Sequence, residues 1–328
     1  RGLQVKICLL SCSYRLHFLR SWSLRQTRCG SLGWEFRSES QAPVASIYKA
    51  TTGIPSIFYR ADMDVNTDGG PRSYHPDDPR GKTKALNNIV NAISGIYSSY
   101  GGKWIGCKPK SGDCFDKYVS VFEEARDARY SASAGTRWVM TDGMIPWKYD
   151  LAQKRKMPCI VTEGKYKGYF VSQTAYTLRV GDKCDPARYL DSVAINANVL
   201  PQGTHWESEG VLTDGFDLVV VVGKDDRTAF GVNGDRGPAT SIGEVSVAMA
   251  AEINAVELSG NETYQQVKEL ALDEVSYLIF PNIDIKRLKG PSFTQEDVDE
   301  IGEQVFQNWG GLERLRRCRT TLKKHGDH

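Results

Sequence analysis

The chain has 328 residues, of which 40% are hydrophobic, and this is enough to bury a sizeable core in one large domain or two small ones. Lysine and arginine total 42 against 40 for aspartate and glutamate, so no global basic excess favours a nucleic acid as partner. The longest strongly apolar run, residues 218–222, is far shorter than the ~20 residues of a membrane-spanning helix, so no membrane partner is expected.

The first 30 residues differ in charge from the rest of the chain. They hold six basic residues and no acidic one. We expect residues 1–40 to be a disordered or targeting leader, with an incomplete gene start as the alternative. The remainder divides into a catalytic domain over residues 41–290, with a helical insertion at 83–135, and a C-terminal helical extension over 291–328.

The first predicted elements combine one strand and two helices. A short strand over residues 54–59 leads into an acidic, glycine-rich loop over 62–70, whose polarity predicts a surface position. Helices are predicted over 83–98 and 117–130, because apolar residues recur there at three- and four-residue spacing.

After residue 136 the pattern changes to short strands separated by turn residues, at 137–141, 159–162, 168–172, 193–200, 216–222 and 228–232. Such spacing indicates a barrel or a sandwich. The segment 216–222 is apolar on both faces and predicts a central strand, which forms a hairpin with 228–232. The fold class is therefore mainly β: a β-barrel-like core, for which the double-psi type is a candidate, with peripheral helices and helical insertions.

The last part of the chain is predicted to be mostly helical. Helices are expected over 243–253 and 263–270, with a late strand at 277–280 between them and the C-terminal region. Ser292 or Thr294 is expected to cap a final helix that runs through Asn308. The basic tail after Glu313 is expected to be a solvated helix end.

Eight cysteines are present without any C-x-x-C pair, which disfavours a zinc or redox site. Cys107 and Cys114 bracket a short loop that a disulfide could close, as in an oxidising compartment. Cys159 and Cys184 could equally be buried thiols. No G-x-G-x-x-G or Walker loop appears, so no cofactor is expected.

The acidic loop offers candidate substrate ligands. Asp62, Asp64 and Asp68 could hold the ammonium groups of glucosamine, and a solvated turn is the alternative reading. Residues 64–69 match the first six positions of an EF-hand loop, but position twelve is His75 rather than glutamate, so no metal is expected. Aromatic residues could form sugar-stacking platforms, although most are expected in the core: Tyr74, Trp104, Trp138, Trp147 and Trp206.

Asp235 and Glu244 are the candidate catalytic pair. Each has a structural alternative: Asp235 suits a turn, and Ser241 with Glu244 has the spacing of a helix capping box. As a pair, Asp235 closes the central hairpin and Glu244 opens the next helix, so both carboxylates are expected at one end of the barrel. Glycosidases need such a pair, one acid and one base.

Four segments in order resemble the family 75 glycoside hydrolases, the chitosanases known chiefly from filamentous fungi. They are residues 57–65 with 73–78, 168–174, 185–192 with 199–201, and 234–238 with 242–246. Together they span roughly residues 45–282. The chain departs from the usual pattern at Arg236 and Val245.

The resemblance implies an endo-acting, inverting hydrolase of the β-1,4 linkages of chitosan, secreted and extracellular, with the catalytic residues at Asp235 and Glu244. It also covers Tyr74 and His75, which we add to the expected substrate-binding residues. Glu244 is the hypothetical general acid and Asp235 the base, although a carboxylate in the first turn of a helix has its pKa lowered, which an acid does not need. A monomer is expected. The alternatives are a non-catalytic amino-sugar-binding protein and a barrel hydrolase of chitin or peptidoglycan glycan.

Overall fold

The computed structural model describes residues 30–36, 45–93, 95–97, 112–131, 138–140, 143–202 and 215–323. Its main sheet has eight strands: β1 (Ser31–Phe36), β2 (Ala45–Ala50), β3 (Ser56–Asn66), β8 (Ala197–Pro201), β9 (Asp217–Val222), β10 (Thr228–Gly237), β11 (Glu244–Ser246) and β12 (Leu272–Asp284). Their order is β1-β2-β3-β11-β8-β10-β9-β12.

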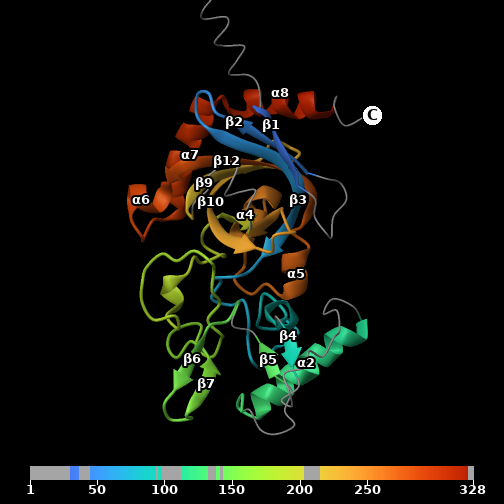
Figure 1. Cartoon of the computed structure of the whole chain (residues 1–328), viewed down its shortest axis with the longest axis vertical. Helices are drawn as coiled ribbons and strands as arrows, with labels where there is room; N and C mark the ends of the chain where they lie inside the picture. The colour runs from blue at the N-terminus through green and yellow to red at the C-terminus, as the bar shows by residue number, and fades with distance from the viewer. Residues whose placement is uncertain are drawn as a thin grey trace, which may run out of the picture.

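An additional pairing of β3 with β12 closes six of these strands, β3, β11, β8, β10, β9 and β12, into a barrel. This confirms the mainly β fold class with a barrel core and peripheral helices. The double-psi assignment stays a prediction. Figure 1 shows the barrel as a ring of strands with α4 (Val247–Asn254) in its middle.

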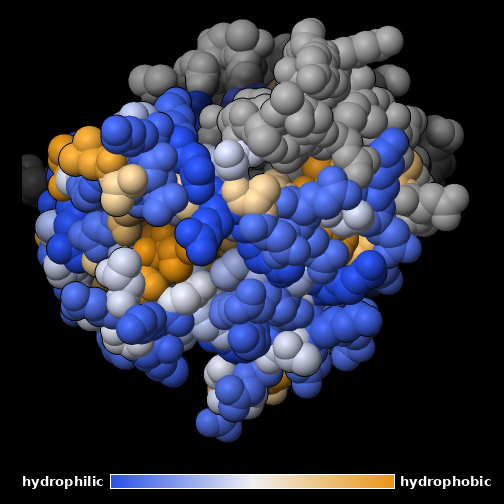
Figure 2. Space-filling model, turned by 90° about the horizontal axis from the view of Figure 1, so that it is seen from below, coloured by the Kyte–Doolittle hydropathy of each residue, from blue (hydrophilic) through white to orange (hydrophobic). Residues whose placement is uncertain are grey.

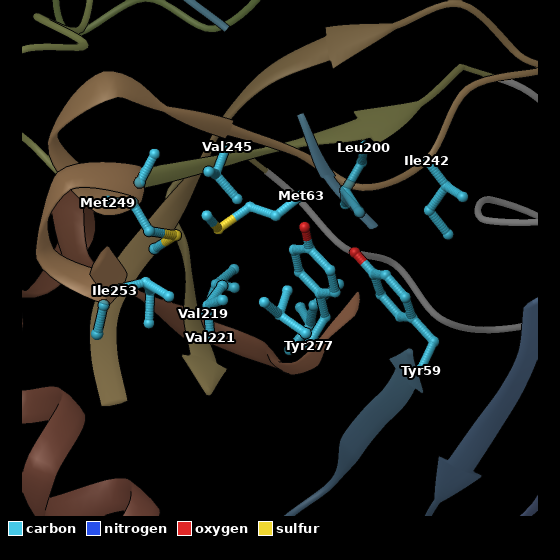
Figure 3. Close-up of a cluster of buried hydrophobic side chains, with 14 of the residues drawn as sticks. Tyr59, Met63, Leu200, Val219, Val221, Ile242, Val245, Met249, Ile253 and Tyr277 are labelled. Carbon is cyan, nitrogen blue, oxygen red and sulfur yellow. The ribbon is translucent and has the colours of Figure 1, made fainter. Parts of the chain in front are cut away.

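Strand β9 shows why the ring closes around an apolar core. Val219 and Val221 belong to the cluster inside the barrel, together with Tyr59 and Tyr277, which stack in parallel at 4.7 Å (Figure 3). The alternate β9 residues belong to a second cluster outside the barrel. Both faces of the strand are therefore buried, which is why its sequence is continuously apolar, and its predicted central place in a hairpin with β10 is confirmed.

The second cluster lies beneath the C-terminal helices α6 (Ile285–Lys289), α7 (Gln295–Trp309) and α8 (Gly311–Lys323). Thr294 caps α7 by accepting a hydrogen bond from the Asp297 amide, as expected. The expectation of a solvated tail is wrong for α8. Leu315 and Cys318 are fully buried, and Arg319 donates to the Val222 carbonyl of β9, so α8 packs against the barrel.

The predicted leader is also corrected. Residues 31–36 form β1, which pairs antiparallel with β2, and Phe36 is buried in the barrel cluster. Residues 1–29 and 37–44 lie outside the part of the chain that the structure describes.

A smaller lobe lies below the barrel in Figure 1. It contains α2 (Gly112–Asp127), the pair β4 (Gly95–Tyr97) with β5 (Trp138–Met140), and the pair β6 (Trp147–Asp150) with β7 (Arg155–Pro158). Helix α2 matches the helix predicted at 117–130. The segments predicted as strands at 159–162 and 168–172 form an isolated bridge between Ile160 and Phe170 and share backbone hydrogen bonds, but neither is a regular strand.

The helix predicted over residues 83–98 is wrong, although its apolar residues are buried as expected. Only Ile89–Ala92 form a short 3₁₀ helix, and 95–97 form β4. The amides of Asn87 and Ile89, which a helix would pair with carbonyls four residues earlier, donate instead to the carbonyls of Ser73 and Pro79. The Asp78 carboxylate accepts hydrogen bonds from the amides of residues 82–85 and anchors the start of the segment as a turn.

Candidate active site

A β-bulge in β10 sets the direction of the Asp235 side chain. In the pairing with β8, Asn233 lies opposite Asn198 and Asp235 lies opposite Val199, so Gly234 is an extra residue. In a strand without a bulge, alternation would put Asp235 on the same side as Asn233, inside the barrel. The bulge therefore turns Asp235 outward. A Cβ at Gly234 would lie only 2.6 Å from that of Ala197, so this position has no room for a side chain.

Glu244 lies in a strand, which corrects the prediction that it opens a helix. It is the first residue of β11 and pairs with Val199 of β8 on one side and with Asp64 of β3 on the other. Gly243 has a φ of +99°, a left-handed conformation that a helix does not tolerate. The helix begins after Ser246, whose side chain caps it. The objection that a helix N-terminus lowers the pKa of this carboxyl is therefore removed.

Asp235 and Glu244 thus flank the same residue, Val199. Residues opposite each other on paired strands carry their side chains on the same face of a sheet. On β8 and β11, the adjacent residues Leu200 and Val245 belong to the interior cluster, so Val199 and Glu244 face outward. Two strand spacings separate the Cα atoms of the pair by roughly 9–10 Å. Both carboxylate residues are partly exposed to solvent.

The two side chains have different supports. Asp235 Oδ1 accepts hydrogen bonds from the amides of Ala175 at 2.6 Å and Arg236 at 2.8 Å, and Oδ2 accepts from Asn66 at 3.5 Å. Glu244 Oε1 accepts from Ser241 Oγ at 3.2 Å. Burial raises the pKa of Asp235 to about 6 and the Glu244 charge adds to this, while the amide hydrogen bonds oppose the shift. Asp235 therefore titrates near neutrality, where a general base is effective.

Asp68 is a third carboxyl at this site, and sequence reasoning placed it on a surface loop. Its Oδ1 accepts hydrogen bonds from Tyr74 Oη at 2.9 Å and from Ser172 Oγ at 3.4 Å. Burial raises its pKa to about 8, and the charges of Asp235 and Glu244 act in the same direction. Asp68 therefore belongs to the same electrostatic group as the pair.

The remaining acidic candidates, Asp62 and Asp64, lie on β3. Strand β3 runs to Asn66, so Asp62 and Asp64 are strand residues rather than loop residues. The neighbouring Tyr59 and Met63 lie inside the barrel, and alternation turns Asp62, Asp64 and Asn66 outward. Asp64 is exposed and lies directly beside Glu244, whereas Asp62 packs against Gly243, where an added Cβ would lie 2.8 Å from the Asp62 carboxylate.

Of Tyr74 and His75, only Tyr74 contacts the site. The Tyr74 ring is buried in the apolar cluster of the smaller lobe, and only its hydroxyl group reaches the site. His75 is 7% exposed; its Nδ1 accepts from the Asp77 amide, and its ring packs edge-on against Tyr169. Neither ring is therefore an open platform for a sugar, and no contact of His75 with Asp68, Asp235 or Glu244 is found.

Of the other aromatic candidates, Trp147 packs edge-on against Tyr130 in the smaller lobe. Trp138 lies on β5, and Trp104 and Trp206 lie outside the described residues. Figure 2 shows the molecule from below: among the coloured residues, hydrophilic ones cover most of the face and hydrophobic ones form separate patches.

A disulfide ties down the loop that contacts the carboxylates. Cys159 and Cys184 are bonded, which resolves the alternative of free thiols, and they pack with Val171 and Tyr189 in a small apolar cluster. The loop between them carries Ser172 and Ala175, the donors to Asp68 and Asp235. Cys114 is also disulfide-bonded, while Cys107, its suggested partner, lies outside the described residues.

A cavity of about 410 Å³ lies elsewhere, between β12, the turn after β9 and α8. Its Arg319 is fully engaged with Asp226, Ser276 and backbone carbonyls, which makes this residue a link between α8 and the barrel.

Within the described ranges, no cluster of three or more His, Cys, Asp or Glu side chains could hold a metal ion. Among the same residues, no helix has both the length and the apolar character needed to cross a membrane.

Comparison with known proteins adds no relative. No family model matches the chain, and no curated protein matches it.

Proposed function

We propose that this protein is a secreted, endo-acting glycoside hydrolase that cleaves the β-1,4 linkages of chitosan with inversion of configuration. The observation that supports this best is the placement of Asp235 and Glu244 on either side of Val199, on one outward face of the barrel. Retaining enzymes hold their carboxyl groups ~5–5.5 Å apart and inverting enzymes ~6.5–9.5 Å apart. Two side chains that leave the sheet two strands apart favour the wider class.

In the proposed reaction Asp235 is the base and Glu244 the acid. Asp235 accepts a proton from a water molecule, whose oxygen bonds to the anomeric carbon. Glu244 donates its proton to the glycosidic oxygen as the bond to that oxygen breaks. The pKa of Asp235, about 6, leaves the carboxylate ionised at neutral pH, as a base requires. No metal or cofactor takes part in these steps.

The charge of the site supports a cationic polymer as substrate. Asp64, Asp68, Asp235 and Glu244 lie on neighbouring strands or contact them, and among the described residues no lysine, arginine or histidine pairs with Asp68 or Asp235. An acidic surface attracts and orients a partner of opposite charge. The Cys159–Cys184 disulfide supports an oxidising, extracellular setting.

The direct test measures viscosity and reducing-end release on chitosans of graded acetylation. We expect a rapid fall in viscosity, activity that declines as acetylation rises, and the inverted anomer as first product by NMR. Asp235→Asn and Glu244→Gln should each lower kcat by at least ~10²-fold. Matched controls are Asp273→Asn and Glu257→Gln, which change exposed carboxylates on β12 and after α4.

Three outcomes contradict the proposal. Binding of chitosan without release of reducing ends indicates a non-catalytic amino-sugar-binding protein. Activity that increases with acetylation indicates chitin or peptidoglycan glycan as the substrate. Folded Asp235→Asn and Glu244→Gln proteins that retain full activity exclude this pair.

A further inference from the structure

Asp68 occupies a position that disfavours a negative charge until a cation arrives. Its carboxyl lies between the barrel and the smaller lobe, where Tyr74 and Ser172 both donate to the same oxygen, Oδ1. No hydrogen bond to Oδ2 from another described residue is found, which leaves this oxygen to carry a proton.

The two charged groups that act on the Asp68 carboxyl are both negative. Asp235 on β10 and Glu244 on β11 are the carboxylates that act on it, and Tyr74 is the third titratable neighbour. No described lysine, arginine or histidine forms an ion pair with Asp68. Burial beside two like charges destabilises the ionised form.

We propose that Asp68 is protonated in the free protein and that binding of a cationic amino sugar drives this proton from the carboxyl into solvent. The inference rests on the proposed function and adds a role for a residue outside the catalytic pair. An ammonium group beside Oδ2 supplies the missing opposite charge, so the carboxylate becomes the favoured form. The proton passes to water or buffer, and Asp68 then holds the ammonium group by an ion pair.

The Asn66 side chain connects Asp68 to the proposed base, Asp235. The Asp68 amide donates to Asn66 Oδ1 at 2.6 Å, and the side-chain amide of the same Asn66 donates to Asp235 Oδ2. The Asn66 side chain therefore contacts the backbone of Asp68 with its oxygen and the carboxylate of Asp235 with its nitrogen. The ammonium charge offsets the negative charge that Asp68 gains, so the net charge beside Asp235 stays the same. Asp68 is in this sense a substrate-sensing residue rather than a third catalytic acid.

The test counts protons by calorimetry. An oligomer of glucosamine is titrated into the Asp235→Asn protein at about pH 6, where most of its amines are charged, in two buffers with different heats of ionisation. The Asp235→Asn background prevents cleavage during the titration and removes Asp235, whose pKa is also raised. It removes one of the two charges that raise the Asp68 pKa, while burial, the largest cause, remains. An opposite charge nearby lowers a carboxyl pKa by about 1–3 units, which from a value of about 8 corresponds at pH 6 to release of roughly 0.1 to 0.9 proton per oligomer bound.

Two controls show whether the released proton comes from Asp68. Adding Asp68→Asn to this background should bring the release close to zero, because the amide mimics the protonated carboxyl but holds no acidic proton. A neutral N-acetylglucosamine oligomer should release no proton. Infrared difference spectra of the wild-type protein against Asp68→Asn should show a protonated-carboxyl band that disappears on addition of glucosamine oligomer.

The outcomes distinguish the two proposals. Tight binding of the oligomer without proton release, or with equal release from Asp68→Asn, overturns the role of Asp68 and leaves the chitosanase proposal standing. Proton-linked binding in a protein that never releases reducing ends supports Asp68 as a cation site and overturns the enzyme. Absence of any binding overturns both.

Discussion

The amide of Ala175 donates to Asp235 Oδ1 at 2.6 Å, so the carboxylate at the end of a barrel strand is held by a loop of the smaller lobe. The contact joins residues 60 positions apart in the chain. It also opposes the effect of burial, since a donated hydrogen bond stabilises the ionised form. Both the position and the pKa of the proposed base therefore depend on the lobe as well as on the barrel.

The acidic limb of the pH profile should report Asp235. Because a base must be ionised, kcat/KM on a soluble glucosamine oligomer is expected to rise with pH around a midpoint near 6. Asn66→Ala removes one donor to the carboxylate, which raises the pKa and moves the midpoint upward by a few tenths of a unit. A midpoint that moves downward, or a limb near the ordinary carboxyl range, contradicts the assignment.

Asp68→Asn should change how stability depends on pH. The folded protein binds the Asp68 proton up to about pH 8, whereas the unfolded chain releases it near 3.8. Between these values the folded state holds one more proton, so its stability falls as pH rises, by up to ~1.4 kcal/mol per pH unit. The variant lacks this dependence, and its stability relative to wild type should increase from pH 5 to pH 8 in urea unfolding. Asp273→Asn, an exposed change, should give a flat difference, and an equally flat difference for Asp68→Asn would contradict the raised pKa.

Gly234→Ala tests the bulge. The added methyl would lie 2.6 Å from Ala197 Cβ and 2.7 Å from Leu190 Cδ2, so we expect a loss of ~1–3 kcal/mol in unfolding free energy. Activity should fall further, because a shifted bulge redirects Asp235. The matched control is Gly143→Ala, where no atom lies within 4 Å of the added Cβ. Wild-type stability and activity in Gly234→Ala would show that the bulge does not set the side chain.

Removal of the Cys159–Cys184 disulfide tests the loop. In the chain-entropy account, a loop closed across a separation of 25 residues contributes about 3.5 kcal/mol, so the Cys159→Ala/Cys184→Ala protein should unfold at a lower denaturant concentration. Its acidic limb should also move upward, because a looser loop weakens the Ala175 donor. Substitution is cleaner than a reductant, which would also attack the bonds of Cys114 and Cys318. An unchanged pH profile in the double variant would show that the disulfide does not influence the pKa of Asp235.

The sequence predicted the barrel well where burial and strand pattern agree. The apolar run from Leu218 to Val222 is buried on both faces, and the turn after it returns the chain as β10. It predicted burial but not conformation at Leu86 and Ile89, because the amides of Asn87 and Ile89 donate to the distant carbonyls of Ser73 and Pro79 rather than to helical carbonyls. No periodicity reveals such a tertiary hydrogen bond.

For the site, the sequence supplied Asp235 and Glu244 but not their local structure. The Ser241–Glu244 spacing fits a capping box, yet the two side chains hydrogen-bond while Glu244 lies in a strand. The positive φ of Gly243 and the cap at Ser246 are the signals that separate these readings. Asp68 could not be placed, because its burial depends on Tyr74 and Ser172 from distant segments.

The pairing of Asp64, Glu244, Val199 and Asp235 on four adjacent strands forms a line that runs across the sheet, at right angles to the strands. Each step along this line is one inter-strand spacing, about 4.8 Å. The two steps between Glu244 and Asp235 are set by the hydrogen-bond ladder of the barrel. The width of the gap that a sugar and a water molecule would share between the proposed acid and base is therefore fixed by backbone geometry and insensitive to most side-chain substitutions.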